Sequence, residues 1–172
     1  MEGAVRKKPL ETRERILDAA EDVFNARGVS RTTLNEIAEA AGVTRGAIYW
    51  HFKNKVELFE AMCDRVRGPM KALVEKTADK DTEDPLEQLS AGHENLMQGI
   101  IDNPHYRKVL NILFHKCEYT DESDAIVIQQ KEWQTYCNSM IQNTLSNAQL
   151  RKQLPEDLDI GLASRLMGFT FS

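Results

Sequence analysis

The segment between Thr33 and Lys55 carries two helix-start signals separated by a glycine, and it constrains the fold more than any other feature of this 172-residue chain. Thr33 and Glu36 have the spacing at which a threonine and a glutamate cap the start of a helix reciprocally. Gly42 can adopt the positive φ that ends such a helix, and Thr44 can cap a second, shorter one. Two short helices joined by a turn that contains a glycine predict a helix-turn-helix unit.

Apolar residues elsewhere in the chain recur at the spacing of an amphipathic helix, and no run alternates as a half-buried strand does. One such stripe precedes the helix-turn-helix and ends before Gly28, which is a plausible helix stop. A long helix should begin at about Lys55 and be kinked or weakened at Gly68-Pro69. The sequence therefore predicts an all-α fold.

Helix starts in the second half are marked by a capping residue followed by proline, as at Asp84-Pro85 and Asn103-Pro104. Residues 118–123 have the composition of a turn. We predict a long helix after it, from about Asp124 to Leu150, and a final helix from near Asp157.

Composition and charge place the chain among ordinary globular proteins, with 41% hydrophobic and 28% charged residues. No apolar run approaches the roughly 18 residues of a membrane span. The charged N-terminus lacks the apolar core of a secretion signal. The three cysteines form no CxxC pair, which favours a reducing compartment. We therefore predict a cytoplasmic protein.

No constellation of side chains points to catalysis. The histidines have no recognisable Ser or Cys partner, and the glycines form neither a phosphate-binding loop nor a dinucleotide fingerprint. His115 and Cys117 are two residues apart, which places them on different faces of a helix and suits a metal poorly. The sequence predicts no enzyme, no catalytic residue, no cofactor and no metal.

Charge is unevenly distributed along the chain. Residues 1–56 carry 10 Lys and Arg against 8 Asp and Glu, whereas residues 57–172 carry 12 against 19. An acidic protein can still bind nucleic acid through a locally basic end.

The second helix of the helix-turn-helix combines packing residues with groups that can read DNA. Ile48 and Phe52, together with Ala47, should hold this short helix against its neighbours, since it is too short to be stable alone. Arg45, near its start, can reach the two guanine acceptors in the major groove. Gly46 allows the backbone to approach the bases closely, and Ala47 can contact a thymine methyl group.

Other residues around this helix are suited to phosphates. Tyr49 and His51 can donate hydrogen bonds, and Lys55 begins the next helix, where the helix dipole also favours an anion. Each residue has a simpler explanation when it is taken alone. The DNA-reading interpretation puts Trp50 on the outward face with Arg45, Gly46 and Tyr49. Taken alone, we expect Trp50 to be mostly packing in the three-helix core, and His51 to be a surface or packing histidine.

Residues Thr12 to Phe59, "TRERILDAAEDVFNARGVSRTTLNEIAEAAGVTRGAIYWHFKNKVELF", closely resemble the DNA-binding domain of the TetR family of bacterial repressors. "VTRGAIYWHFKNK" and the later "NILFHKCE" look like the subgroup that represses multidrug efflux pumps, the acriflavine-resistance regulator type. The rest of the second half matches more weakly.

The resemblance implies a two-domain repressor that binds a palindromic operator on double-stranded DNA as a homodimer. The DNA-binding domain would be residues 1–54, and residues 55–172 would form a larger helical domain for ligand binding and dimerisation. The family's phosphate-contacting positions carry over to Thr33, Thr44, Tyr49, His51 and Lys55, and its base-reading positions to Arg45, Gly46 and Ala47. The family pairs through its last two helices, so we expect the natural chain to continue beyond Ser172.

The resemblance also implies release from DNA by a small hydrophobic or drug-like effector, and hence control of a multidrug efflux pump. The positions that line the effector cavity in this subgroup carry over to Val66, Met70, Leu89, Leu96, Leu110, Phe114, Cys137, Ile141 and Ser172. The apolar residues among them would serve equally well in an ordinary core.

Two other functions remain open at this point. The chain could be a TetR-type regulator of a metabolic or other operon with a single specific effector. It could also be a helical protein-interaction module without DNA binding, although such a module would not explain why Arg45, Tyr49 and Lys55 occur together.

Overall fold

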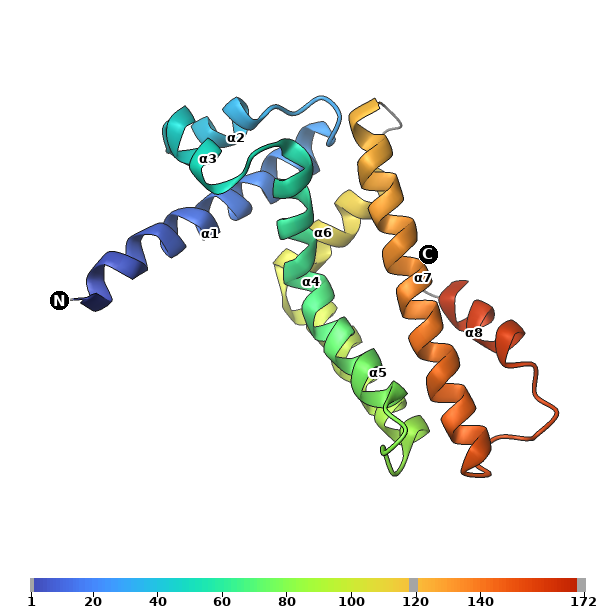
Figure 1. The fold of residues 1–172 in the computed structure, drawn as a ribbon. Coiled ribbons are helices and arrows are strands. Elements are labelled where there is room, and N and C mark those ends of the chain that lie inside the picture. Colours follow the sequence, from blue (N-terminus) through green and yellow to red (C-terminus); the bar gives the residue numbers. More distant parts are fainter. Residues whose placement is uncertain (1, 118–120, 170–172) are drawn as a thin grey trace. The chain divides into compact units, whose positions relative to one another are not determined.

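The computed structural model describes residues 2–117 and 121–169, and the side chains of residues 10–117 and 125–167. These ranges contain helices and no strand, which confirms the all-α prediction. None of their helices is both long and apolar enough to cross a membrane. The helices are α1 (Glu2–Arg27), α2 (Leu34–Ala40), α3 (Arg45–His51), α4 (Lys55–Ala78), α5 (Pro85–Asp102), α6 (Pro104–His115), α7 (Asp121–Leu150) and α8 (Ile160–Phe169) (Figure 1).

Several predicted helix boundaries are confirmed by the hydrogen bonds made there. Gly28, at φ 86°, directly follows the end of α1. The Asp84 carboxylate accepts a hydrogen bond from the N–H of Glu87 at 3.0 Å, at the start of α5. The Asn103 side chain likewise accepts one from the N–H of His105 at 2.9 Å, at the start of α6. Side-chain caps of this kind satisfy backbone donors that have no partner inside the helix.

Two boundaries differ from the prediction. α7 begins at Asp121 rather than at about Asp124, so the segment predicted as a turn is helical from residue 121, and residues 118–120 lie outside the described ranges. α8 begins at Ile160 rather than near Asp157, because the Asp159 carboxylate accepts the N–H of Leu162 at 2.9 Å. Asp157 and Asp159 have the same capping chemistry, and only the path of the backbone decides that Asp159 caps α8.

The chain divides into two compact units, and α4 and α7 each contribute to both. The first unit contains residues 1–66 and 103–127, and the second contains residues 67–102 and 128–172. α4 remains helical through Pro69, three residues beyond this division. The first half of α4 and all of α6 therefore pack with the helix-turn-helix helices. The functional division expected at residues 54 and 55 stays a prediction.

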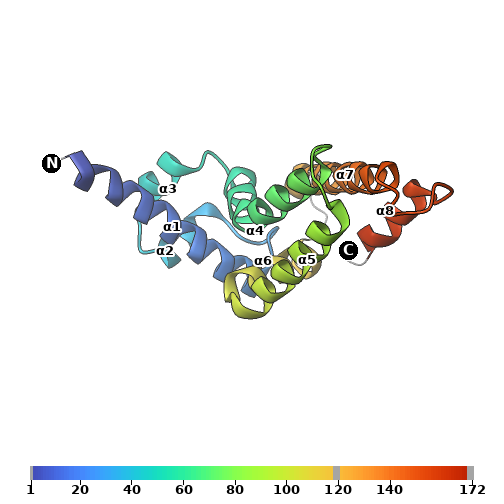
Figure 2. The same cartoon turned by 90° about the horizontal axis from the view of Figure 1, so that it is seen from below.

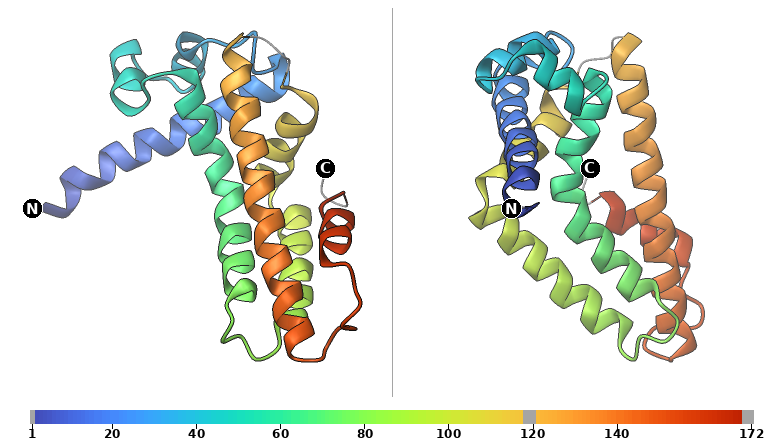
Figure 3. Two further views of the ribbon diagram at one scale, coloured as in Figure 1. Left: turned by 45° about the vertical axis from the view of Figure 1, so that its right-hand side comes forward. Right: turned by 60° about the vertical axis from the view of Figure 1, so that its left-hand side comes forward.

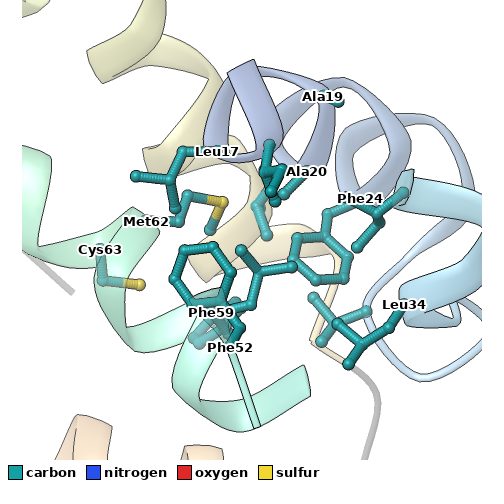
Figure 4. Packing of buried hydrophobic residues seen from close by; sticks show 14 of the residues in the cluster. Leu17, Ala19, Ala20, Phe24, Leu34, Phe52, Phe59, Met62 and Cys63 are labelled. Carbon is teal, nitrogen blue, oxygen red and sulfur yellow. The ribbon is translucent and has the colours of Figure 1, made fainter. Parts of the chain in front are cut away.

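The first unit is built around one apolar core supplied by α1, α2, α3, α4 and α6, with Ile126 from the start of α7 (Figure 4). Phe24 of α1 and Phe59 of α4 meet edge to face with their ring centroids 6.0 Å apart. Ile112 carries the core onto α6, which packs against α1 (Figure 2). The N–H of Val29 donates to the carbonyl of Lys116 at 3.0 Å, so the end of α6 also holds the loop that leads into α2.

A charged network joins α1, α4 and α6 at the edge of this core. Arg65 Nη1 donates to Asp18 Oδ1 at 2.7 Å and to Glu21 Oε1 at 2.8 Å, and Nη2 bonds the Glu14 carboxylate. His105 Nδ1 lies 2.5 Å from the other Glu21 oxygen. Burial alone would lower the pKa of Arg65, but its bonds to Asp18, Glu14 and Glu21 outweigh burial and raise the pKa above its usual range.

The second unit brings the later half of α4 beside α5 and α7 (Figure 3). α4 and α7 run parallel there, since Thr77 bonds Thr144 at 3.2 Å and Ala78 accepts from Asn147 at 3.0 Å. α5 approaches α4 closely at Gly92, where an added Cβ would lie 2.0 Å from Leu73 Cδ1.

This close approach predicts opposite effects for two glycines of α5. Gly92→Ala should lower the free energy of unfolding by about 1 kcal/mol, because overpacking against Leu73 outweighs the better helix propensity of alanine. Gly99→Ala should raise it by up to about 1 kcal/mol, because nothing lies within 4 Å of the new Cβ. Urea denaturation of both variants would measure the difference, and equal effects would contradict the close packing.

Candidate nucleic-acid interface

The two helix-start signals of the sequence are both present as caps. The Thr33 hydroxyl accepts the N–H of Glu36 at 3.3 Å, and the Glu36 carboxylate accepts the N–H of Thr33 at 2.8 Å. The backbone and hydroxyl of Thr33 lower the pKa of Glu36. The Thr44 hydroxyl accepts the N–H of Ala47 at 3.2 Å and starts α3. Gly42 between them has φ +63°, so the predicted helix-turn-helix is confirmed.

Arg15 fixes this turn from outside, and sequence reasoning missed it. Its Nη2 donates to the carbonyl of Ala41 at 2.6 Å and to that of Gly42 at 3.3 Å. These carbonyls lie at the end of α2, where backbone acceptors have no partner within the helix. Arg15 and Ala41 are 26 positions apart, and no local pattern around an arginine on α1 marks it as the partner of this turn. Only the tertiary structure reveals the contact.

α3 presents one apolar face to the core and one mixed face to solvent. Ile48 and Phe52 are fully buried, while Arg45, Gly46 and Tyr49 are exposed. The Arg45 guanidinium lies over the Tyr49 ring, 5.6 Å from its centroid. Arg45 and Gly46, which are predicted to read bases, therefore lie exposed at the N-terminal end of α3, and a cation–π contact with Tyr49 orients the arginine.

Trp50 corrects the sequence prediction. It was expected to pack mainly in the three-helix core, but its side chain is 73% exposed. Ile48 and Phe52 already fill the core side of α3, and Trp50 falls on a different face at 100° per residue. A large exposed aromatic residue on a seven-residue helix is an unusual use of surface, because water contact with its ring is unfavourable.

His51 and Lys55 lie at the C-terminal side of α3. The His51 ring meets Trp50 edge to face at 4.6 Å. Burial lowers the pKa of His51 and the charge of Arg13 lowers it further, so the imidazole is neutral at pH 7. Lys55 Nζ donates to the carbonyl of Ser30 at 3.1 Å, which places this ammonium at the loop between α1 and α2.

The residues expected to bind an effector are divided between the two compact units. Val66, Leu110 and Phe114 belong to the first unit, where Val66 is buried and Phe114 is 52% exposed. In the second unit, Ile141 is buried and the others are half-buried: Met70, Leu89, Leu96 and Cys137. Ser172 lies outside the described residues. Their shared role stays a prediction.

Three potential metal ligands come close together at the charged network. Ligand atoms of Asp18, Glu21 and His105 lie within 4.8 Å of one another. The Arg65 guanidinium already bonds both carboxylates, so the positive charge of this cluster is supplied by the protein itself. The arrangement is suited to joining helices.

Comparison with known proteins supports the same interpretation. Residues 16–62 match the family described as "Bacterial regulatory proteins, tetR family", and residues 84–172 match "MAATS-type transcriptional repressor, C-terminal region". The HTH-type transcriptional regulator TtgR of Pseudomonas putida is 40% identical over 162 residues, which cover 94% of this chain and 77% of TtgR.

Solved structures of repressors have the same fold. The SmeT–triclosan complex superposes with a TM-score of 0.86 at 33% identity, over 94% of this chain and 77% of SmeT. NalD, the secondary repressor of the MexAB-OprM multidrug efflux pump in Pseudomonas aeruginosa, gives a TM-score of 0.82 at 33% identity, over 96% of this chain and 82% of NalD. The chain belongs to the tetR family of bacterial regulatory proteins.

Proposed function

We propose that the chain is a ligand-responsive transcriptional repressor that controls a multidrug efflux pump and leaves its operator when a small hydrophobic compound binds. The observation that carries the proposal is α3, a capped helix with Arg45, Tyr49 and Trp50 on its exposed side. Relatives described as repressors of efflux pumps support the physiological role. These relatives are regulators, and we assign this chain to the cytoplasm with no catalytic role.

In this proposal, α3 enters the major groove. Arg45 reads guanine, while Gly46 and Ala47 allow close approach and contact with a thymine methyl group. The phosphate contacts come from around the helix and are made by Thr33, Thr44, Tyr49, His51 and Lys55. Thr33 and Thr44 stand at helix N-termini, where backbone donors and the helix dipole favour anions.

The proposal includes a homodimer on a palindromic operator. A two-fold axis between two copies of α3 requires half-sites separated by one helical turn or a multiple of it. The side chains of Leu162 and Leu166 on α8 are 50% and 61% exposed, respectively. This exposure supports an apolar surface that a second copy of the chain covers.

A titration of full-length protein against operator fragments at several salt concentrations tests the DNA-binding part. The logarithm of the affinity should fall linearly with the logarithm of the salt concentration, because phosphate contacts release counterions. Affinity should also depend on both half-sites. An absence of salt-dependent binding to the promoter region of the neighbouring operon would exclude this proposal and favour a protein-interaction module.

Trp50→Ala should change DNA binding more than folding. The side chain is 73% exposed, so we expect the free energy of unfolding to change by no more than about 0.5 kcal/mol. Operator binding should weaken by about 1 kcal/mol or more, as for a buried aromatic contact at an interface. Leu150→Ala is the matched control, since Leu150 is also exposed but lies at the far end of α7. Equal operator affinity of the two variants would show that Trp50 makes no contact with DNA.

Operator affinity should increase as the pH falls from 8 to 6. The free protein holds the pKa of His51 below its ordinary value, through burial and then Arg13, whereas a phosphate oxygen would stabilise the imidazolium and raise it. The complex therefore binds more protons than the free protein, and lower pH favours it by up to about one logarithmic unit per pH unit and protomer. His51→Gln should flatten this dependence. An unchanged slope would show that His51 makes no such contact.

A further inference from the structure

Arg67 of α4 has an unusual environment within the second unit. Its guanidinium lies over the ring of Trp133 on α7, 5.3 Å from the centroid. Its Nε is buried and has no hydrogen-bond partner. Among the described side chains, no carboxylate forms an ion pair with it. The contrast with Arg65, two positions earlier, is complete, because Arg65 bonds three carboxylates.

The groups around Arg67 do not neutralise its charge. Burial raises the pKa of Cys137 to about 11, although Arg67 lowers it somewhat, so the thiol is uncharged at pH 7. Glu75, two turns further along α4, accepts the hydroxyl of Tyr136 at 2.6 Å and lies 3.9 Å from Lys71. A buried donor without a partner is unfavourable in a folded protein, and a bound water, ion or ligand that accepts from it removes this cost.

Two aromatic rings lie beside Arg67 in this environment. Trp133 and Tyr136 stack with their centroids 5.8 Å apart and an interplanar angle of 28°. Lys71 lies over Tyr136 at 5.9 Å, so two cations of α4 face two rings of α7. Positions 67, 70, 71 and 74 share one face of α4 by helical spacing, and Met70 is among the predicted effector residues.

We propose that Arg67 anchors an effector that combines an aromatic ring with an anionic oxygen, as in an aromatic carboxylate or a phenolate. The planar guanidinium offers parallel donors that match the two oxygens of a carboxylate or converge on the single oxygen of a phenolate, and the interaction is charge-assisted in both cases. The neighbouring rings accept the aromatic part by stacking. A cationic aromatic compound is disfavoured by Arg67 and Lys71 together. The inference rests on the proposed ligand-responsive function and gives its effector a chemical class.

Three compounds on one scaffold test the charge preference: 2-naphthoate, 2-naphthamide and 2-naphthylmethylammonium. Binding to this 172-residue chain is followed without DNA by the fluorescence of Trp133, in a Trp50→Phe background that leaves Trp133 as the single tryptophan among these residues. We expect 2-naphthoate to bind at least about tenfold more tightly than the amide, as for a hydrogen bond to a charged group. The cation should bind most weakly.

Arg67→Gln should remove the preference for the acid over the amide. Lys76→Gln, an exposed position on the same helix, should retain it and is the matched control. Arg67→Lys keeps the charge without the planar fork and should give an intermediate preference. Thermal unfolding of each variant separates loss of folding from loss of binding. Equal binding of the acid to Arg67→Gln and to the parent, or tighter binding of the cation, would overturn the inference.

Operator release in the protein with Trp50 retained separates this inference from the proposed function. Release by the amide and the cation as well as by the acid, unchanged in Arg67→Gln, would leave the repressor function standing and overturn the role of Arg67. Binding of the acid at Trp133 without operator release would support the site and contradict ligand-responsive repression. If no compound changed either signal, the anchoring role would be rejected.

Discussion

Arg65→Ala should lower the free energy of unfolding by about 3–5 kcal/mol, because it leaves a buried carboxylate without its charged partner. The Glu21 side chain is 0% exposed, so solvent cannot replace the bond it loses, and the His105 imidazole, 2.5 Å from its other oxygen, is the partner that remains. Glu14 and Asp18 would then also face Glu21 without the guanidinium between them. The effect should be large because a single side chain joins α4 to three positions of α1.

Lys108→Ala is the control for this experiment. Lys108 pairs with Asp22 across α6 and α1, but their side chains are 37% and 65% exposed. Surface pairs of this kind contribute about 0.2–1 kcal/mol. Urea unfolding at one fixed protein concentration compares the two variants. Losses of equal size would show that the Arg65 network is solvated and contributes no more than a surface pair.

Arg45→Ala should weaken operator binding by about 1–3 kcal/mol and reduce the preference for the operator over unrelated DNA. The physical reason is the loss of a forked donor to a base edge, from a side chain that is exposed in the free protein and needs little reorganisation. Folding should be unaffected, since the contact of Arg45 with Tyr49 lies on the surface. Competition titrations with operator and random DNA measure both quantities.

Lys55→Ala provides the contrasting result. A phosphate contact carries no sequence information, so this variant should weaken all DNA sequences alike and reduce the salt slope by about one unit. The loss of its bond to the Ser30 carbonyl will also contribute, and the unfolding free energy of the variant measures that part. If Arg45→Ala kept full operator preference, the assignment of base reading to this residue would be wrong.

The sequence determined the elements that depend on local chemistry. The cap at Thr33, the positive φ at Gly42 and the cap at Thr44 each follow from a residue and its near neighbours, and all three are present. The alternation of helix-stop and helix-start signals was therefore enough to predict the helix-turn-helix, and helical spacing elsewhere was enough to predict the all-α fold. The start of α8 was missed because Asp157 and Asp159 carry identical local signals.

Only the tertiary structure decided which side chains face the core and which charges meet. Trp50 was expected inside and lies outside, because Ile48 and Phe52 already occupy the space between α3 and its neighbours. The bond from Arg65 to Glu21 spans 44 positions, and nothing local distinguishes this arginine from Arg67. Local capping depends on a few adjacent dihedral angles, whereas burial and ion pairing depend on how distant helices pack, and that information is distributed over the whole core.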